Sequence, residues 1–306
     1  MNKTTGTLLT MLSAMTFGFA FTLGPMTYAM GSNPVTLTFL RNALALPVLA
    51  IVLLMQHTSL KVSKKQLLNL LILGVVGNAI TTLMLNIAFS LIDVGIVTTI
   101  HFVYPVFVTL ACVLFFKEKL GGRKIIALGI ATAGIATFFF GTDTSGADGS
   151  KALVGLILAV CSGITYAFYI IFMDKSGLKG EPTFKITFYV ALMSAVTMGA
   201  FGGLSGQLTL TTITSMGWII SIVFAILCTV VALSLLQIGI KSVGASTAAI
   251  LTTFEPITSV VFGVILLGES VTVIKIVACC LILVGVVTLS LAKQPTAAAL
   301  KDGTAA

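Results

Sequence analysis

Ten long apolar runs follow one another along this chain, and this succession restricts the possible folds more than any other feature. A helix needs about 20 apolar residues to cross the hydrocarbon core of a bilayer. We predict spans at about 5–30, 34–55, 67–90, 94–116, 122–140, 152–173, 182–203, 216–240, 245–267 and 270–292. The expected fold class is therefore an all-α membrane protein with ten transmembrane helices.

Composition excludes a water-soluble fold. Of the 306 residues 58% are hydrophobic and 8% are charged, whereas soluble domains carry about 25% charged residues. The net charge of +8 does not indicate a nucleic-acid partner, because the Lys and Arg residues stand in short connections and form no continuous patch. The lipid bilayer is the expected partner.

The positive charges predict the orientation of the chain. With the N-terminus in the cytoplasm, all of the 17 Lys and Arg residues except Arg41, Lys151 and Lys275 fall on the cytoplasmic side. Because short cytoplasmic loops carry an excess of Lys and Arg, we expect a multi-pass protein of the inner (cell) membrane. Both termini are predicted to be cytoplasmic.

The second half of the chain repeats the first. An offset of 151 residues aligns Pro105 with Pro256 and Gly134 with Gly285. Further aligned pairs are Glu118 with Glu269, Ala127 with Ala278, and, at an offset of 149, Gly6 with Gly155 and Phe19 with Phe168. The polar segment 141–150 divides the spans five and five. We therefore predict one repeat at 1–145, a second at 146–292, and a cytoplasmic tail at 293–306.

A unit with an odd number of spans enters the membrane from opposite sides in its two copies, so the repeat is inverted. Inverted repeats are typical of secondary transporters, in which two similar halves rearrange around a site near the membrane midplane. The repeat therefore predicts a transporter that works by alternating access.

Several motifs run through the chain: the opening GTLLTMLSAMTFGFAF, the segment LTFLR that ends at Arg41, and a Pro followed thirteen residues later by a Glu. This last element occurs twice, from Pro105 to Glu118 and from Pro256 to Glu269. On these motifs the sequence resembles the EamA family of the drug/metabolite transporter superfamily over essentially its whole length. The resemblance implies a ten-helix inverted-repeat fold with a central cavity and the transport of small metabolites, frequently amino acids or related compounds.

Glu255 is the only acid deep in a predicted span. Ionisable groups in a membrane core are costly and are default functional candidates. Burial disfavours the charged carboxylate, so we predict that Glu255 couples transport to protons. The alternative is a structural acceptor beside Pro256.

The repeat also points to residues of equivalent depth. It places His101 opposite Thr252 and Tyr104 opposite Glu255, and within each helix the two members are three apart and share one face. We predict that these four residues line a cavity, although a lone His within a span can also serve packing.

Other polar side chains complete the candidate site. Tyr166 and Tyr169 lie three apart and are expected to line the cavity and stack on a substrate. Arg41 either attracts an anionic group of the substrate or snorkels to the interface, and snorkelling is the stronger expectation.

Asn78, Gln237 and Thr16 are further candidates to hydrogen-bond a polar solute, although bonding to a neighbouring helix is the commoner role of such residues. The small-residue pairs Ala14 with Gly18 and Gly129 with Ala133 are expected to allow close helix packing.

The chain lacks the ingredients of other function classes. With only His57 and His101, no HExxH motif and no Cys/His cluster, it is not expected to be an enzyme or to bind a metal or cofactor. No GxxxxGK[ST] motif indicates a nucleotide site. We predict export of small-molecule metabolites. The alternatives are a multidrug exporter of lipophilic cations and a passive channel, and the substrate, the coupling ion and the oligomeric state stay open.

Overall fold

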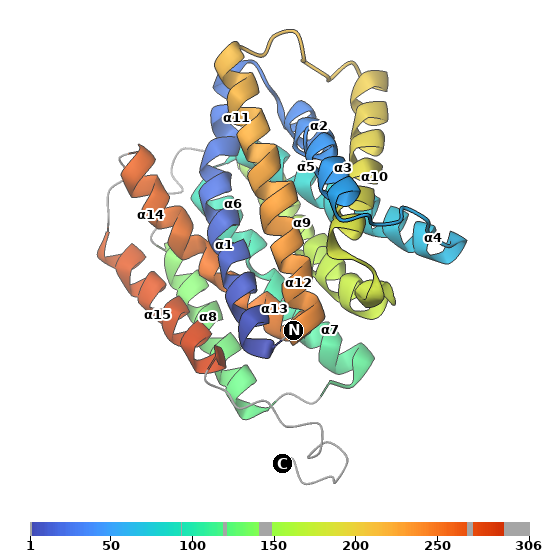
Figure 1. Cartoon of the computed structure of the whole chain (residues 1–306). Helices are drawn as coiled ribbons and strands as arrows, with labels where there is room; N and C mark the ends of the chain where they lie inside the picture. The colour runs from blue at the N-terminus through green and yellow to red at the C-terminus, as the bar shows by residue number, and fades with distance from the viewer. Residues whose placement is uncertain (1, 93, 119–120, 141–148, 268–271, 291–306) are drawn as a thin grey trace.

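The computed structural model describes residues 2–92, 94–118, 121–140, 149–267 and 272–290, and every regular element in these ranges is helical (Figure 1). Among them, seven helical stretches are long and apolar enough to cross a membrane, and two shorter apolar helices cover Tyr104–Phe116 and Ile276–Thr288. The predicted all-helical fold is confirmed, while the count of ten spans stays a prediction. The predicted repeat boundary at 145–146 and the tail lie outside the described residues.

Each predicted membrane span is occupied by helix. The first half contains α1 (Lys3–Met26), η1 (Tyr28–Met30), α2 (Pro34–Ala43), α3 (Ala45–Met55), α4 (Lys64–Ile72), η2 (Leu73–Ile80), α5 (Thr81–Leu91), α6 (Val94–His101), α7 (Tyr104–Phe116) and α8 (Gly122–Phe140). The second half contains α9 (Gly149–Lys175), η3 (Leu178–Gly180), α10 (Thr183–Leu204), α11 (Ser215–Ala225), η4 (Ile226–Ala232), α12 (Leu233–Val243), α13 (Ala245–Leu251), η5 (Thr252–Phe254), α14 (Glu255–Leu267) and α15 (Val273–Ser290). The side chains of Asn33, Ser63 and Thr214 accept hydrogen bonds from backbone N–H groups at the starts of α2, α4 and α11, which sets where these helices begin.

The fourth and ninth predicted spans are broken helices. α6 ends at His101, and α13 gives way at Thr252 to a short 3-10 turn before α14. Pro105 and Pro256 explain both breaks, because a proline lacks the N–H and its ring clashes with the carbonyl four residues earlier. Those carbonyls belong to His101 and Thr252. Since the two prolines are equivalent in the repeat, both halves break at the same place.

The third and eighth predicted spans each contain a π-helical segment, η2 between α4 and α5 and η4 between α11 and α12. π-Helical segments are rare in proteins, and those that occur often lie at functional sites. Gly77 of η2 lies against Tyr169, so that an added Cβ would come within 2.9 Å of the ring atom Cδ2. The π segment in the first half therefore brings α9 and the middle of the third span close together.

The last helix of each half, α8 and α15, pack against each other through equivalent residues. A Cβ added at Gly134 would lie 3.0 Å from the carbonyl oxygen of Ala278, and one added at Gly285 would lie 2.9 Å from that of Ala127. Equivalent residues of the two halves therefore make the same contacts with each other across this interface, which supports duplication. The expected packing role of Gly129 is wrong, because a Cβ there would meet no atom within 4 Å.

The first helices of the two halves make corresponding contacts, α1 with α12 and α14, and α9 with α5 and α7. The expected close packing of Ala14 and Gly18 is confirmed. Ala14 is fully buried, and a Cβ at Gly18 would lie 2.6 Å from the carbonyl oxygen of Glu255. Ser259 of α14 also donates to the carbonyl of Gly18 at 3.1 Å. α1 thereby holds the start of α14 in place.

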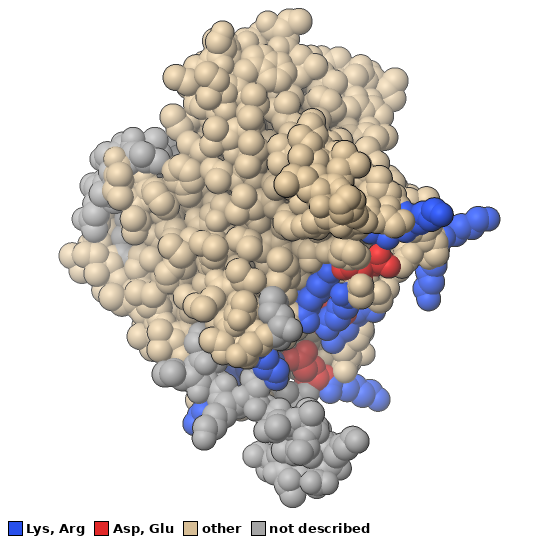
Figure 2. All heavy atoms as spheres, in the orientation of Figure 1, with Lys and Arg blue, Asp and Glu red and all other residues tan. Residues whose placement is uncertain are grey.

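On the face shown in Figure 2, the charged side chains gather at one end of the molecule. Glu181 lies at the centre of a group there: its carboxylate accepts from Lys185 at 2.8 Å and from Gln66, and its backbone carbonyl accepts from Lys241. Lys185 also donates to the carbonyl of Lys61 at 2.7 Å. These five residues, the polar clamp, join the start of α4 to α10 and α12.

At the other end, corresponding loops are joined by uncharged groups. Asn33 and Thr36 both donate to the carbonyl of Gln207, at 2.7 and 3.1 Å, and Thr214 N–H donates to the carbonyl of Met30 at 3.0 Å. The two halves are therefore hydrogen-bonded to each other at both ends. Among the described residues, the bonds between the halves include charged groups at the end with the polar clamp, where Gln66 donates to Glu181 and Lys185 donates to the carbonyl of Lys61.

Candidate functional site

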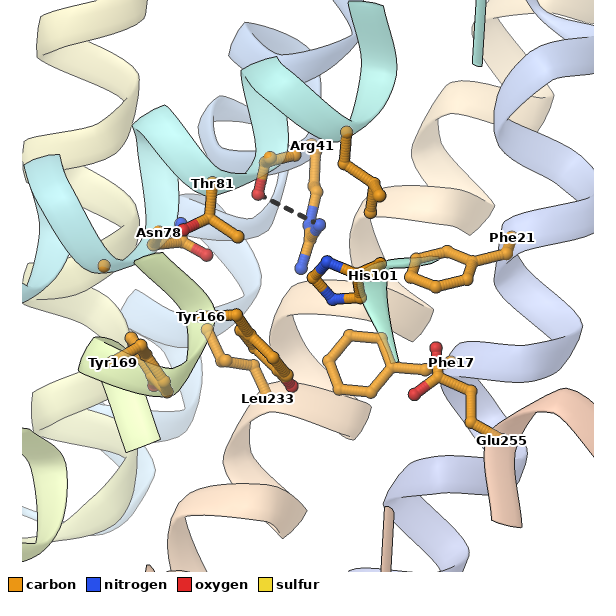
Figure 3. A pocket seen from close by; sticks show the side chains of 13 residues that line it. Phe17, Phe21, Arg41, Asn78, Thr81, His101, Tyr166, Tyr169, Leu233 and Glu255 are labelled. Carbon is orange, nitrogen blue, oxygen red and sulfur yellow. Dashed lines mark hydrogen bonds between the residues drawn. The ribbon is translucent and has the colours of Figure 1, made fainter. Parts of the chain in front are cut away.

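A small cavity lies in the interior, where the breaks of the fourth and ninth spans meet α1, α2, η2, α5, α9 and α12 (Figure 3). Its lining comprises Phe17, Phe21, Arg41, Gly77, Asn78, Thr81, Thr82, Leu85, His101, Tyr166, Tyr169, Leu233 and Glu255. The cavity volume is about 30 Å³, room for a few water molecules. A larger solute therefore enters only when lining side chains or helices move.

Arg41 of α2 points into this cavity. Its side chain is 6% exposed, its Nη1 donates to Thr82 Oγ1 at 3.3 Å, and its guanidinium carbon lies 5.8 Å from the centre of the Phe17 ring. The Nε–H has no partner among the described residues. The prediction that Arg41 snorkels to the interface is wrong, and its guanidinium retains unused donors inside the protein.

Glu255, the first residue of α14, is 3% exposed and lines the same cavity. Among the described residues no ion pair joins its carboxylate to Arg41, and no described group donates a hydrogen bond to it. In the view of Figure 3 the two side chains lie on opposite sides of the cavity, with His101 and Phe17 between them. One buried cation and one buried acid thus face a shared space without neutralising each other directly.

His101 ends α6 and is 4% exposed. Its Nδ1 lies 2.9 Å from Ser162 Oγ, and Ser162 itself donates to the carbonyl of Ala159 at 2.7 Å. A hydroxyl has one proton to give, so His101 Nδ1 is the donor in this contact. Nε2 is then the ring nitrogen left to accept a proton or a hydrogen bond.

Tyr104 and Thr252 meet each other but do not line the cavity. The hydroxyl of Tyr104 donates to Thr252 Oγ1 at 2.6 Å, and Tyr104 is fully buried. Thr252 in turn donates to the carbonyls of Ala248 and Ala249, at 3.1 and 2.9 Å. The structure therefore uses these two candidates to connect the two broken helices.

Tyr166 and Tyr169 line the cavity from α9. Their rings are stacked, with centroids 6.1 Å apart, and Tyr166 packs edge-on against Tyr104 at 4.8 Å and lies 5.3 Å from the ring of His101. Gln237 donates to the hydroxyl of Tyr169 at 2.8 Å from outside the lining. Gln237 thus orients a wall of the cavity and is not part of its surface.

Asn78 lines the cavity, and its amide donates to Asn42 Oδ1 at 2.9 Å and to Ser194 Oγ at 2.8 Å. Thr16 does not line it: its hydroxyl donates to the carbonyl of Leu12 within α1. The neighbouring Phe17 faces the cavity in its place.

Sequence reasoning missed seven of the lining residues: Phe17, Phe21, Gly77, Thr81, Thr82, Leu85 and Leu233. Phe17 and Phe21 stand four apart and share a face of α1, and Thr81 bonds to Thr165 at 2.6 Å. The Thr81–Thr82 pair in an apolar span was the available signal for a polar lining. Among the described residues no group of three His, Cys, Asp or Glu side chains could hold a metal ion.

Comparison with known proteins follows the same division into halves. The model of the EamA-like transporter family matches residues 4–140 and 153–291. A threonine/homoserine exporter, RhtA of Salmonella typhimurium, is 27% identical over 258 residues, which cover 82% of this chain and 81% of the exporter. The RhtA of Escherichia coli is 28% identical over 77% of this chain and 75% of its own length.

An uncharacterized transporter of Synechocystis sp. is 27% identical over 69% of this chain, and the match covers 63% of the cyanobacterial protein. A protein of known crystal structure superposes with a TM-score of 0.79 over 94% of this chain and 96% of that one, at 16% identity. This last similarity concerns the fold alone.

Proposed function

Because this chain belongs to the EamA-like transporter family, we propose that it is a secondary transporter that exports small zwitterionic metabolites, amino acids or closely related compounds, by alternating access. The family makes it a multi-pass membrane transporter. The substrate class, the direction of transport and the coupling to protons are our proposal.

A single observation carries the proposed substrate class: Arg41 and Glu255 line one small cavity without pairing with each other. Burying a charge costs several kcal/mol unless an opposite charge and hydrogen bonds compensate for it. A zwitterion supplies both missing partners. Its carboxylate suits the guanidinium of Arg41, which can bind it through two parallel hydrogen bonds, and its ammonium group suits the carboxylate of Glu255.

The direction of transport rests on the relatives named as threonine/homoserine exporters. We place the end with the polar clamp in the cytoplasm, because Lys and Arg are enriched in cytoplasmic loops. In this arrangement the chain crosses the inner membrane ten times as two inverted repeats, with both termini in the cytoplasm.

Proton coupling follows from the competition for Glu255. A protonated carboxyl group has no charge with which to hold an ammonium group, so a proton and the substrate exclude each other at this residue. A proton that binds from outside displaces the substrate's ammonium group, and release of that proton inside frees the carboxylate for the next substrate. The result is antiport of substrate and proton. In this proposal His101 Nε2, which lines the same cavity, accepts a hydrogen bond from the protonated carboxyl group of Glu255 or from the substrate's ammonium group.

Export of lipophilic cations is the second candidate, favoured by the aromatic rings of Phe17, Phe21 and Tyr166 around the acid. The guanidinium of Arg41 opposes it, because a fixed positive charge in so small a cavity repels a cation. A passive channel is disfavoured by the cavity volume of about 30 Å³, which holds only a few waters.

The test is uptake into proteoliposomes of the full chain, with and without an imposed pH gradient. Threonine and homoserine are compared with an amino-acid amide, which lacks the carboxylate, and a 2-hydroxy acid, which lacks the ammonium group. We expect transport of the zwitterions and loss of transport for both analogues. Transport of a lipophilic cation in the absence of amino-acid transport would select the second candidate.

Variants separate the two charges. Glu255→Gln is expected to abolish accumulation driven by the pH gradient while substrate exchange stays measurable, and Arg41→Gln is expected to weaken recognition of the carboxylate. Glu118→Gln and Arg123→Gln are the matched controls, because they make the same changes outside the cavity. A Glu255→Gln protein that concentrates substrate like the parent would show that Glu255 is not the proton site.

A further inference from the structure

A second hollow lies away from the central cavity, as an apolar groove between α7 and α9 of about 800 Å³. Its walls include Phe107, Leu110 and Leu114 of α7 and Phe168 and Ile171 of α9. Leu110 and Leu114 are 51% and 70% exposed, so the groove opens to the outside of the bundle. In a membrane protein this surface faces lipid.

The internal repeat shows what is missing from this groove. The equivalent helices of the other half, α14 and α1, fill the corresponding space with a pair of rings, Phe262 and Phe19, whose centroids are 4.7 Å apart. The position equivalent to Phe262 is Ala111, which lines the groove. Phe168, the equivalent of Phe19, stacks instead on Phe172 of its own helix, with centroids 5.1 Å apart. One half is therefore packed where the other half leaves space.

The groove has the length of one leaflet of a bilayer. On α9 it extends from Ile164 to Lys175, a rise of about 16 Å at 1.5 Å per residue. Half of a hydrocarbon core is about 15 Å thick. An acyl chain that lies along the groove would therefore reach from the middle of the membrane to the level of Lys175.

The end of the groove at Lys175 is positively charged. Lys175 and Lys179 both pair with the single carboxylate of Asp174. Glu118 is also close enough to act on Lys175, but it is itself paired with Lys124 at 2.9 Å. These three lysines and two acids together carry one net positive charge. The Lys175 ammonium also lies 5.3 Å from the ring centre of Phe116 at the groove wall. A polar, cationic end on an apolar groove matches a lipid with an anionic headgroup.

From this combination we infer that the groove between α7 and α9 is a binding site for an anionic phospholipid of the leaflet at the charged end of the molecule. One acyl chain occupies the groove beside Ala111, and the headgroup phosphate lies at Lys175. The site is separate from the transport cavity, and it does not depend on which solute the protein carries.

Native mass spectrometry of the purified chain, supplied with phosphatidylglycerol or phosphatidylethanolamine, tests this site. Ala111→Phe fills the groove as Phe262 fills its equivalent, and we expect it to lose one tightly bound phosphatidylglycerol. Val261→Phe adds the same ring on an exposed face of α14 and is expected to bind lipid like the parent. Equal lipid binding by Ala111→Phe and the parent would overturn the site. If the parent is a dimer in the same spectra and Ala111→Phe is a monomer with unaltered lipid binding, a second copy of the chain is the occupant and the lipid site is overturned.

The headgroup contact has its own test. Lys175→Gln is expected to lower the preference for phosphatidylglycerol over phosphatidylethanolamine by about fivefold, the effect of one Lys near an anionic surface. Lys179→Gln removes the same charge from the same ion-pair group but does not line the groove, and it is expected to keep most of the preference. Equal losses in both variants would overturn the contact between Lys175 and the headgroup.

A fluorescence experiment does not depend on the folding of Ala111→Phe. In a Trp218→Phe background the chain has no other Trp, so Phe107→Trp reports from the groove and Val261→Trp from ordinary lipid-facing surface. With phosphatidylglycerol brominated in its acyl chains, we expect quenching of the Phe107→Trp variant to saturate at a low mole fraction of the lipid. Quenching of the Val261→Trp variant is expected to follow the bulk fraction. Identical quenching curves for the two variants would contradict the proposal.

Discussion

Replacing Glu181 by Gln removes the charge at the centre of the polar clamp while preserving the shape of the side chain. In the parent, the carboxylate accepts from Lys185 at 2.8 Å and from Gln66. In the Gln variant one of the two accepting oxygens becomes an NH2 group, so Lys185 and Gln66 no longer each have an acceptor there, and Lys185 loses its opposite charge while keeping its bond to the carbonyl of Lys61. The change therefore tests how strongly one end of the molecule is held together by charge.

Exposure decides the size of the effect. The side chains of Lys185 and Glu181 are 8% and 22% exposed. Fully exposed ion pairs contribute about 0–1 kcal/mol, whereas hydrogen bonds to charged groups contribute about 1.5–3 kcal/mol. For this mostly buried pair we expect a loss of about 2 kcal/mol. In the proposed mechanism a second conformation, open at this end, lacks the clamp. If the substitution destabilises only the closed conformation, the equilibrium constant shifts about 30-fold toward the open one.

The same pair predicts a pH dependence. The hydrogen bond from Lys185 is the main cause that holds the pKa of Glu181 below its usual value, and desolvation opposes it. A carboxyl group whose pKa is lowered on folding contributes stability above its unfolded pKa and loses that contribution as the pH falls through the folded value. The difference in stability between parent and Glu181→Gln is therefore expected to be constant from about pH 7 to 5 and to shrink below about pH 4.

Thermal unfolding in detergent, followed by circular dichroism at each pH, measures this difference. Glu118→Gln is the control, because its ion pair with Lys124 lies within one connection and joins no distant helices. We expect a clear fall in melting temperature for Glu181→Gln and a small one for the control. Equal melting temperatures of Glu181→Gln and the parent at about pH 7 would refute the reasoning, because the charge of Glu181 would then contribute nothing to stability.

Two further predictions concern packing and the link between the halves. Gly134→Ala and Gly285→Ala are expected to destabilise the protein by about 1–3 kcal/mol each, because the added methyl groups clash with the facing helix. The control Gly129→Ala is expected to be neutral or stabilising. Equal melting temperatures for all three variants would refute this prediction. Tyr104→Phe removes the donor to Thr252 and is expected to cost about 1 kcal/mol, measured in the same melting experiment, with a change in transport rate larger than the change in substrate affinity. An unaltered rate would show that this bond does not matter for the rearrangement.

Much of the architecture was contained in the sequence. Apolar runs predict membrane helices because the bilayer admits few other structures. The aligned pairs Gly134 with Gly285 and Pro105 with Pro256 indicated the duplication, and in the structure they stand at one symmetric interface and at two helix breaks. The breaks themselves were predictable, because the clash of a proline with the carbonyl four residues earlier is a local rule. The candidates His101 and Glu255 stand beside these breaks for the same reason.

The lining of the cavity was decided by the tertiary structure. Thr16 and Phe17 are neighbours on α1, yet Phe17 faces the cavity and the hydroxyl of Thr16 is bonded within its own helix. Hydropathy does not separate them, because a helix in lipid carries apolar residues on its outer face as well as its inner one. Arg41 shows the same limit. Its long side chain could reach the interface or the interior, and only the neighbouring Thr82 and Phe17, supplied by other helices, determine that it faces Glu255 across the cavity.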